Sequence, residues 1–491
     1  MIQGTSSDAG KSFLVTALCR ALVDEGINVC PFKSQNMSNN SYVTVNGLEM
    51  GRAQGVQAEA ARLEPQVYMN PILLKPRKDT MSEIILLGKV FGSPDGKDYY
   101  KNFTMNEGIT AVRQALKQID ENHDVIVIEG AGSPAEVNLN ASEIVNMRIA
   151  KEADVPVLLV TDVDRGGSLA AVVGTLELIG ADKERVKGII FNKFRGDLAL
   201  FEDAVKYIED YTGVKVVGVL PYLKDVLIES EDSLSINYRF SSNEQNRITV
   251  GIVKMPYVSN NTDIEAFMFE NDVEVILVDR FTYIDMLDAI ILPGTKSTIS
   301  DMKYLQDTGI SEKIRTFYNN GGFVFGICGG YQMLGEKISD DLKMDNENIS
   351  EIKGIGLIKA ETTFEEEKSV KQVNGKCVFE NNNFEVQGYE IHFGKTQISD
   401  KADFEPLFLF DNTLEGLSSK DMRACGTYLH NVFHNDTFRS LWLNKIRLSK
   451  NLHVKDTTDT AFVKEESYNK LAKALYENLD MEYIKKLIYK G

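Results

Sequence analysis

The sequence predicts an α/β protein with two domains, of which the first is built on a doubly wound sheet. A glycine-rich loop at residues 4–12 leads into a segment with helical periodicity, and apolar strands then alternate with helical segments as far as residue 221. A second alternating series begins at Ile248 and contains a short strand that breaks at a Gly-x-Cys-x-Gly sequence. A polar stretch without periodicity separates the two series, so the two domains are expected to have separate cores.

The domain boundaries follow from length and composition. The chain has 491 residues, and domains commonly hold about 100 to 200 residues. Residues Ile236–Arg247 are polar and lack periodicity. We therefore predict a first domain at residues 1–236, a linker at 237–247 and a second domain at 248–491.

Charge and composition exclude several classes of protein. The formal net charge of -18 argues against a surface built for nucleic acid or an anionic membrane. No apolar run reaches the roughly 18 residues that a membrane span requires, and no targeting segment is evident. The five cysteines include no CxxC pair, which favours a reducing compartment, with the cytoplasm as the default, over disulfides or a zinc site.

The loop at residues 4–12 is predicted to bind the phosphates of ATP. Backbone N–H groups in such a loop point at phosphates, Lys11 supplies a cation, and the Ser12 hydroxyl supplies a magnesium ligand. The loop residues expected to contact ATP are Gly4, Thr5, Asp8, Gly10, Lys11 and Ser12. Only three residues precede Gly4, so we expect a frayed first strand or a native start upstream of Met1.

Other polar residues follow the apolar strands of the first domain. Glu129 comes directly after a buried strand, where it is expected to hold Mg²⁺, although a helix-capping carboxylate is the simpler alternative. Asp162, Asp164 and Arg165 follow the next strand and are candidates to bind metal or substrate carboxylates. Asn192, with Lys193, resembles the base-recognition corner of P-loop proteins.

A cysteine at the end of a strand is the main feature of the second domain. Phe323–Phe325 is followed by Gly326-Ile327-Cys328-Gly329-Gly330, which is typical of a nucleophile elbow, in which glycines permit a tight strand-to-helix turn. A buried structural cysteine is the alternative. His430 lies about a hundred residues downstream, and the turn at Gly294 offers N–H groups for an oxyanion hole.

The turn at Gly294, the elbow at Cys328 and the later His430 follow one another in an order that resembles a class I glutamine amidotransferase domain. The resemblance covers about Ile248 to Phe438. The resemblance implies that Cys328 attacks the amide of glutamine and that His430 transfers the proton, which yields a glutamyl thioester and ammonia. It also implies that Gly294, Gly329 and Gln332 form the oxyanion and glutamine-binding positions.

One position departs from this pattern. The family usually continues His-x-Glu, and the glutamate orients the imidazole, but this chain has Val432 there. Either a Cys-His dyad operates, or another carboxylate such as Glu390 or Asp436 orients His430. The sequence leaves this open, together with the role of His392.

The first domain resembles that of the cobyric acid synthase family. Five residues separate Gly4 from Gly10, as in the P-loop variant of dethiobiotin synthetase, and Lys33–Ser41, Gly51–Gly55 and Asn70–Pro76 resemble cobyric acid synthase segments. Since Lys33–Ser41 follows a buried strand, it is expected at the ligand-binding edge of the sheet. The resemblance implies that Lys33 lies near the phosphates and that the corrinoid contacts Gln35, Asn36, Ser38, Asp164 and Arg165.

The family resemblance predicts one combined activity. A P-loop domain that makes an acyl phosphate and a cysteine domain that makes ammonia together form an amide synthetase. The resemblance implies ATP- and glutamine-dependent amidation of the b, d, e and g carboxylates of adenosylcobyrinic acid a,c-diamide, with Mg²⁺ and without a tightly bound prosthetic group. The alternatives are cobyrinic acid a,c-diamide synthase and a P-loop scaffolding ATPase with an inactive amidotransferase module. The sequence does not define the oligomeric state.

Overall fold

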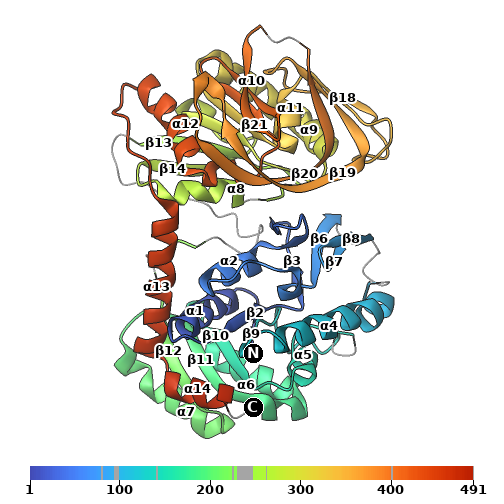
Figure 1. The fold of residues 1–491 in the computed structure, drawn as a ribbon. Coiled ribbons are helices and arrows are strands. Elements are labelled where there is room, and N and C mark those ends of the chain that lie inside the picture. The colour runs from blue at the N-terminus through green and yellow to red at the C-terminus, as the bar shows by residue number, and fades with distance from the viewer. Residues whose placement is uncertain are drawn as a thin grey trace. The chain divides into compact units, whose positions relative to one another are not determined.

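The computed structural model describes residues 1–78, 81–92, 99–139, 142–223, 226–228, 247–260, 262–399 and 402–489. The chain forms two compact units (Figure 1). Unit 1 comprises Met1–Thr44, Glu49–Glu231 and Phe462–Gly491, and unit 2 comprises Val45–Leu48 and Asp232–Ala461. Of the expected linker at 237–247, only Arg247 is among the described residues.

The core of unit 1 is a parallel sheet. Its strands run in the order β1-β10-β11-β12, and the parallel pair β2-β9 joins β1 through a bridge between Ile2 and Glu129. The strands are β1 (Ile2–Gly4), β2 (Val29–Phe32), β9 (Val125–Ile128), β10 (Val157–Asp162), β11 (Val186–Phe194) and β12 (Val216–Pro221). β1 is short, as expected. The short, apolar, mostly buried strands agree with the parallel sheet predicted from the sequence.

The remaining strands of unit 1 form a smaller mixed sheet and a hairpin. The sheet has the order β3-β6-β7-β8, and β4 pairs with β5. These strands are β3 (Gln35–Met37), β4 (Ser41–Val43), β5 (Glu49–Gly51), β6 (Ile72–Lys78), β7 (Met81–Leu86) and β8 (Lys89–Gly92). The helices are α1 (Lys11–Asp24), α2 (Arg52–Ala60), α4 (Ile109–Asp120), α5 (Met147–Glu152), α6 (Ser168–Leu178), α7 (Glu202–Thr212), α13 (Thr460–Asn478) and α14 (Met481–Tyr489).

The last two helices differ from the predicted domain boundary. Residues 462–491 cluster with unit 1, although the sequence pattern predicted that they belong to the second domain. Leu471, Leu475 and Ile484 are buried in one apolar cluster with Leu14 and Leu18 of α1. Figure 1 shows α13 and α14 in red beside β12, where Asp480 N donates to Val217 O at 2.9 Å. The reason is physical: their apolar faces complete the core on which α1 packs.

Unit 2 contains a long mixed sheet. The strand order is β14-β13-β15-β16-β23-β22-β21-β19-β17-β18, with β20 paired to β19. The first five strands are parallel: β14 (Val273–Val278), β13 (Ile248–Val253), β15 (Ala289–Leu292), β16 (Phe323–Ile327) and β23 (Ala424–Thr427). The others are β22 (Thr413–Ser419), β21 (Phe404–Phe410), β19 (Ala360–Cys377), β20 (Glu385–Ile398), β17 (Lys337–Ser339) and β18 (Glu351–Lys353).

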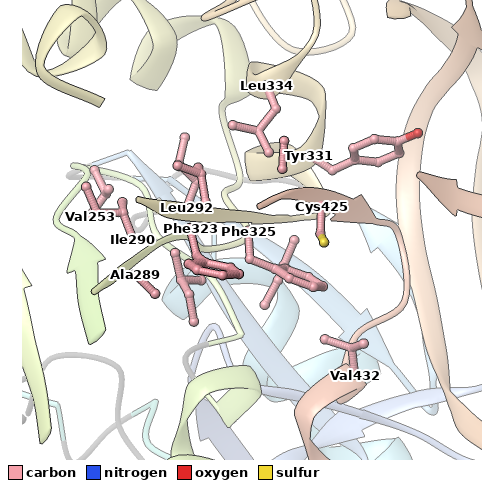
Figure 2. Packing of buried hydrophobic residues seen from close by; sticks show 14 of the residues in the cluster. Val253, Ala289, Ile290, Leu292, Phe323, Phe325, Tyr331, Leu334, Cys425 and Val432 are labelled. Carbon is pink, nitrogen blue, oxygen red and sulfur yellow. The ribbon is translucent and has the colours of Figure 1, made fainter. Parts of the chain in front are cut away.

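The helices of unit 2 pack on its parallel strands. They are α8 (Thr262–Glu265), α9 (Thr298–Asp307), α10 (Ile310–Asn319), α11 (Gly329–Leu334) and α12 (Asp436–Ser449). Phe325 of β16 lies against Phe433, which precedes α12, and against Trp442 of α12, with ring centroids 4.8 and 5.7 Å apart. Val432 is fully buried in the same cluster (Figure 2). A glutamate at position 432 would therefore place a carboxylate in an apolar core.

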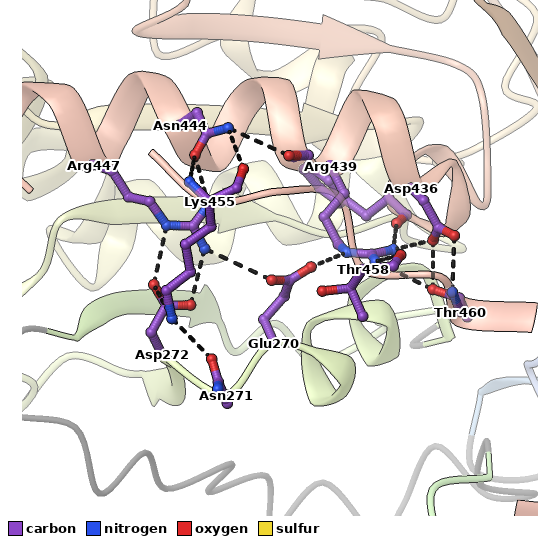
Figure 3. Close-up of polar contacts among 12 residues, drawn as sticks. Glu270, Asn271, Asp272, Asp436, Arg439, Asn444, Arg447, Lys455, Thr458 and Thr460 are labelled. Atoms are coloured by element: carbon purple, nitrogen blue, oxygen red, sulfur yellow. Dashed lines mark hydrogen bonds and ion pairs between the residues drawn. The ribbon is translucent and has the colours of Figure 1, made fainter. Parts of the chain in front are cut away.

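A buried ion network fixes α12 to the segment before β14 (Figure 3). Arg447 donates to both oxygens of Asp272, at 3.0 and 2.9 Å, and Arg439 donates to Glu270 at 2.8 Å. Lys455 adds an ion pair with Asp272 at 3.2 Å. Burial would raise the pKa of Asp272, but Arg447 and Lys455 outweigh that effect and lower it. These charges are all paired, as buried charges must be.

We predict that Arg447→Met destabilises unit 2 by about 3 to 5 kcal/mol, because Asp272 loses its bidentate partner while remaining buried. The single tryptophan, Trp442, is buried in the core of this unit, so urea unfolding followed by its fluorescence reports on unit 2. The control is Lys303→Met, which breaks an exposed i,i+4 pair with Asp307 and should cost about 0 to 1 kcal/mol. Equal losses in the two variants would contradict the prediction.

Candidate functional site

Four neighbouring parallel strands of unit 2 lead into the residues of a first candidate site. β16 ends at Cys328, β23 is followed by His430, β15 by Gly294, and the segment after β13 carries Asp263. The carboxyl ends of parallel strands meet at one edge of a sheet, which is where open α/β folds bind ligands. We call Cys328, His430 and Asp263 the cysteine site.

The predicted nucleophile elbow is present. Cys328 joins β16 to α11 with φ 52° and ψ -109°, a strained backbone conformation for a residue with a side chain. Its N–H donates to Thr427 O at 2.8 Å, which ties the elbow to β23. A Cβ on Gly330 would lie 2.0 Å from Leu292 O, so only glycine allows this close approach of the turn to β15.

Asp263 is the carboxylate that orients His430. Its Oδ2 lies 2.7 Å from His430 Nδ1, and its Oδ1 accepts from the Asn431 N–H at 2.7 Å. His430 is 1% exposed and Asp263 is fully buried. Since a carboxylate only accepts hydrogen bonds, Nδ1 must carry a proton, which leaves Nε2 for chemistry.

The environment favours the charged form of His430. Burial alone would lower its pKa, but the Asp263 carboxylate, the Cys328 thiol and hydrogen bonds to both raise it to about 10. The imidazole also stacks on Tyr389, with ring centroids 5.0 Å apart. Asp263 and Cys328 together therefore favour a proton on the imidazole of His430.

The two carboxylates considered from the sequence contact other groups. Glu390 pairs with Lys371 at 3.1 Å and lies 3.5 Å from His392 Nε2. Asp436 accepts from Arg439 at 2.9 Å. Sequence reasoning missed Asp263, whose only signal is a polar segment after the first strand of the domain. His392 stacks on Tyr428 with centroids 3.8 Å apart and contacts Gly394 O at 2.8 Å.

Two glycines frame the sulfur. A Cβ on Gly294 would lie 3.1 Å from His430 Cε1 and 3.7 Å from Cys328 Cβ, so this turn touches both reactive side chains. Gly329 is the first residue of α11, and the N–H groups of a first helical turn have no partner within the helix. Both positions are thus suited to donate to an oxyanion beside Cys328.

Hydrogen bonds to buried side chains hold the surrounding loops. Gln332 accepts from Thr298 Oγ1 at 3.0 Å and donates to Tyr428 Oη at 3.3 Å. Asp301 accepts from Thr295 Oγ1 at 2.5 Å, next to Gly294. Burial raises the pKa of Asp301 to about 7, although hydrogen bonds oppose the shift. The N–H of Gln332 also donates to Cys328 O at 3.1 Å, which places Gln332 next to the cysteine site.

A second candidate site lies in unit 1. The loop at residues 4–12 connects β1 to α1, and Gly10 adopts φ 97° at the start of the helix. Lys11 Nζ donates to the carbonyl oxygens of Ser6 and Gly132, at 3.0 Å each. Thr5 N donates to Val160 O at 2.9 Å, so the loop is anchored to β10. This is the strand–loop–helix context that a phosphate-binding loop requires.

Glu129 is the centre of this second site. We call Glu129, Ser12, Lys33 and Gln57 the carboxylate site. Ser12 Oγ and Lys33 Nζ each lie 2.8 Å from Glu129 Oε1. Gln57 Nε2 donates to Glu129 Oε2 at 2.5 Å. Glu129 is fully buried. Sequence reasoning predicted the first three residues and missed Gln57, which lies on α2.

The donor set fits magnesium. Adjacent oxygen ligands of Mg²⁺, at about 2.0 to 2.1 Å from the metal, lie about 2.9 Å apart. Ser12 Oγ and Glu129 Oε1 are separated by 2.8 Å, which matches that spacing. In the described part of the chain, no group of three or more His, Cys, Asp or Glu side chains is arranged to hold a metal. Mg²⁺ here would depend on these two oxygens and on phosphate and water oxygens.

The other predicted nucleotide and corrinoid residues fall into two groups. Near the loop, Asn192 Nδ2 donates to Ala9 O at 2.9 Å, and Arg165 pairs with Asp8 at 2.9 Å. Asp164 pairs with Arg195 at 2.9 Å and is exposed. These residues lie at the ends of β10 and β11 beside the loop.

The second group lies on and after β3. Asn36 is buried and donates to Gln54 Oε1 at 3.1 Å, and Gln35 accepts from the Tyr99 hydroxyl. Ser38 Oγ accepts from the Asn40 N–H at 3.0 Å. This polar layer borders α2, which also carries Gln57.

Comparison with known proteins identifies both units. Residues 249–438 match the CobB/CobQ-like glutamine amidotransferase domain, and residues 1–230 match the AAA domain family. Cobyric acid synthase of Geobacillus kaustophilus (strain HTA426) is 44% identical, covering 99% of this chain and 97% of that protein. The same-named proteins of Dehalococcoides mccartyi (strain CBDB1) and Clostridium botulinum (strain 657 / Type Ba4) are each 42% identical and cover 99% or more of this chain and 99% of their own length. Among solved structures, PurLQS from Thermotoga maritima has a TM-score of 0.31 and 16% identity, over 41% of this chain and 97% of that one.

A P-loop domain joined to a CobB/CobQ-like amidotransferase domain defines the class of glutamine-dependent amide synthetases. Within that class, this chain belongs to the cobyric acid synthase family. The predicted fold class and the family resemblance are confirmed, and neither alternative function is favoured. Among the described residues, no helix has the length and apolar character needed to cross a membrane.

Proposed function

We propose that this protein amidates the b, d, e and g carboxylates of adenosylcobyrinic acid a,c-diamide in cobalamin biosynthesis, with glutamine as nitrogen donor and ATP as activator. The observation that carries the proposal is similarity to cobyric acid synthases over 99% or more of the chain. The cysteine site and the carboxylate site supply the two half-reactions. The five cysteines are all free and buried, which suits a reducing compartment such as the cytoplasm.

The cysteine site would release ammonia. Cys328 attacks the side-chain carbonyl of glutamine, and the N–H groups of Gly294 and Gly329 donate to the oxyanion. His430 then gives its Nε2 proton to the departing ammonia, and Asp263 stabilises the imidazolium before that transfer. Water hydrolyses the glutamyl thioester and regenerates the thiol. Gln332 shapes the glutamine pocket.

The carboxylate site would make the acceptor reactive. A carboxylate resists attack by ammonia because its leaving group would be oxide, whereas phosphorylation gives it a good leaving group. Lys11 and the loop amides position the phosphates of ATP, and Lys33 lies beside Glu129 to bind the transferred group. When bound by Ser12 and Glu129, Mg²⁺ would neutralise phosphate charge. Asn192 is assigned to the base of ATP.

The corrinoid is assigned to the polar residues at the edges of unit 1. Gln35, Asn36 and Ser38 offer amide and hydroxyl groups, while Asp164 and Arg165 offer charges. A substrate with several carboxylates and carboxamides needs both donors and acceptors. These assignments rest on family resemblance, on the position of Arg165 beside the loop, and on the polar layer that Gln35, Asn36 and Ser38 form next to α2.

Mass spectrometry tests the proposed reaction directly. The protein is incubated with adenosylcobyrinic acid a,c-diamide, ATP, Mg²⁺ and glutamine. Each exchange of a carboxyl for a carboxamide lowers the mass by about one dalton, so we expect a series that ends after four exchanges. If the mass did not change while glutamine was still hydrolysed, the glutaminase activity would be supported, but the corrinoid would not be the acceptor substrate.

We predict that Asp263→Asn lowers kcat for glutamine hydrolysis by about 10²- to 10⁴-fold, because the imidazole loses both its orientation and its counter-charge. Without the carboxylate, only Cys328 still opposes the effect of burial, so the pKa of His430 falls from about 10 and the alkaline loss of activity moves to lower pH. A pH profile of kcat measures this shift, and Glu390→Gln is the control that should leave it in place. An unshifted profile would contradict the role of Asp263.

A further inference from the structure

Gln57 belongs to the carboxylate site but has no role in the half-reaction described above. It lies on α2 and is fully buried. Its Nε2 donates to Glu129 Oε2 at 2.5 Å, whereas Ser12 and Lys33 contact the other oxygen, Oε1. Gln57 and Ser12 therefore contact different oxygens of the Glu129 carboxylate.

Chemistry fixes the orientation of the Gln57 amide. A carboxylate can only accept hydrogen bonds, so the NH₂ group must face Glu129 and the carbonyl oxygen must face away from it. That oxygen, Oε1, is buried and has no hydrogen-bond donor in the part of the chain that the structure describes. Buried acceptors without a donor are uncommon in native proteins and point to a ligand.

The reaction restricts which ligand can fill this position. Phosphate oxygens and the substrate carboxylate are acceptors and would repel a carbonyl oxygen. The groups with positive character that take part in the bond-forming step are Mg²⁺ and the N–H groups of ammonia, whereas the carboxamides and hydroxyl groups of the two substrates do not react. The two oxygens that would bind Mg²⁺ are Ser12 Oγ and Glu129 Oε1, whereas Gln57 contacts the other carboxylate oxygen, Oε2. This arrangement favours ammonia over the metal.

We propose that Gln57 Oε1 is the ammonia-binding acceptor of the amidation centre, an inference that rests on the assignment of the carboxylate site to acyl-phosphate chemistry. Ammonia donates one N–H to Oε1 and keeps its lone pair free. Its nitrogen forms the bond to the acyl carbon, the C–O bond to phosphate breaks, and a nitrogen proton leaves with the phosphate as hydrogen phosphate.

A neutral acceptor suits this task better than a carboxylate. A carboxylate beside the nitrogen would favour ammonium, which has no lone pair for attack. A carboxamide oxygen orients the N–H without adding charge, so the bound nitrogen stays nucleophilic. The contact with Glu129 holds the amide of Gln57 in this orientation.

The test uses the full-length Gln57→Met variant with ammonium chloride as the nitrogen source and no glutamine. We expect the KM for ammonia to rise about tenfold, the effect of losing about 1.4 kcal/mol of binding. Acyl phosphate that is not captured is hydrolysed, so more ADP should form per amide than in the unaltered protein. A general loss of structure would lower ADP and amide together and leave their ratio unchanged.

Gln54→Met is the matched control, because Gln54 lies on the same helix, is equally buried and bonds to Asn36. It should keep the ratio of ADP to amide unchanged. Calorimetric titration with Mg²⁺ and ADP adds a second readout, for which Gln57→Met should keep its affinity. If Gln57→Met left the KM for ammonia and the ratio of ADP to amide unchanged, the proposal would be overturned. If the variant bound ADP more weakly in the presence of Mg²⁺, the ligand of Gln57 Oε1 would be the metal and not ammonia. If the unaltered protein formed neither ADP nor amide from ammonium chloride and the corrinoid substrate, the assignment of the carboxylate site itself would be wrong.

Discussion

Replacing Cys328 with alanine is expected to reduce glutamine-dependent synthesis by about 10⁴-fold or more, because no other group can form the glutamyl thioester. Synthesis with ammonium chloride should continue, since the carboxylate site is unchanged. Alanine keeps the Cβ and so adds no new strain at φ 52°. The measurement is amide formation from each nitrogen source, followed by mass spectrometry.

The matched control for that variant is Cys377→Ala. Cys377 is also fully buried in unit 2, but it lies on β19 away from the elbow. Its replacement should leave use of both nitrogen sources intact. If Cys328→Ala kept full use of glutamine, the nucleophile would have to be another residue.

Lys11→Ala is expected to reduce synthesis by about 10³-fold or more with either nitrogen source, because the loop loses the cation that stabilises the phosphoryl group in transit. Glutamine hydrolysis should persist, since Cys328, His430 and Asp263 all lie in unit 2. Amide formation and glutamate release, measured in parallel, separate the two activities.

Lys117→Ala serves as the control for charge removal in unit 1. The Lys117 side chain is 77% exposed and forms a 3.7 Å ion pair with Glu121. Its loss should leave both activities unchanged. Full synthesis by Lys11→Ala would show that the loop does not act on ATP in this way.

Residues at strand ends were the most predictable part of the two sites. Cys328 follows a short apolar strand and is flanked by glycines, and Ser12 opens a helix after a glycine-rich loop, so local sequence defines both conformations. Glu129 ends a buried strand and lies 2.8 Å from Ser12. In each of these cases, the neighbouring residues fix the backbone that positions the side chain.

Residues whose roles depend on distant contacts could not be predicted in this way. Asp263 lies 167 positions before His430, and no local pattern links an acid after β13 to a histidine after β23. Gln57 on α2 likewise reaches Glu129 across 72 positions. Such pairs follow from strand order and helix packing, which one sequence does not specify.

The difference between the predicted domain boundary and the compact units of the structure has the same cause. The amphipathic pattern of α14 indicates that one face is buried, but not which core receives it. The structure places Leu471, Leu475 and Ile484 in the cluster of unit 1, beside Leu14 and Leu18. Sequence adjacency favoured unit 2, and tertiary packing decided otherwise.

The placement of these last helices bears on synthesis of the protein in the cell. A ribosome releases the chain from its N-terminus, so β1, α1 and the strands that follow emerge first. The cluster around α1 is completed only by residues 471–484, whereas unit 2 is almost continuous in sequence. We therefore expect the amidotransferase unit to fold before the ATP-using unit, whose core keeps an apolar face uncovered until residues 471–484 have been synthesised.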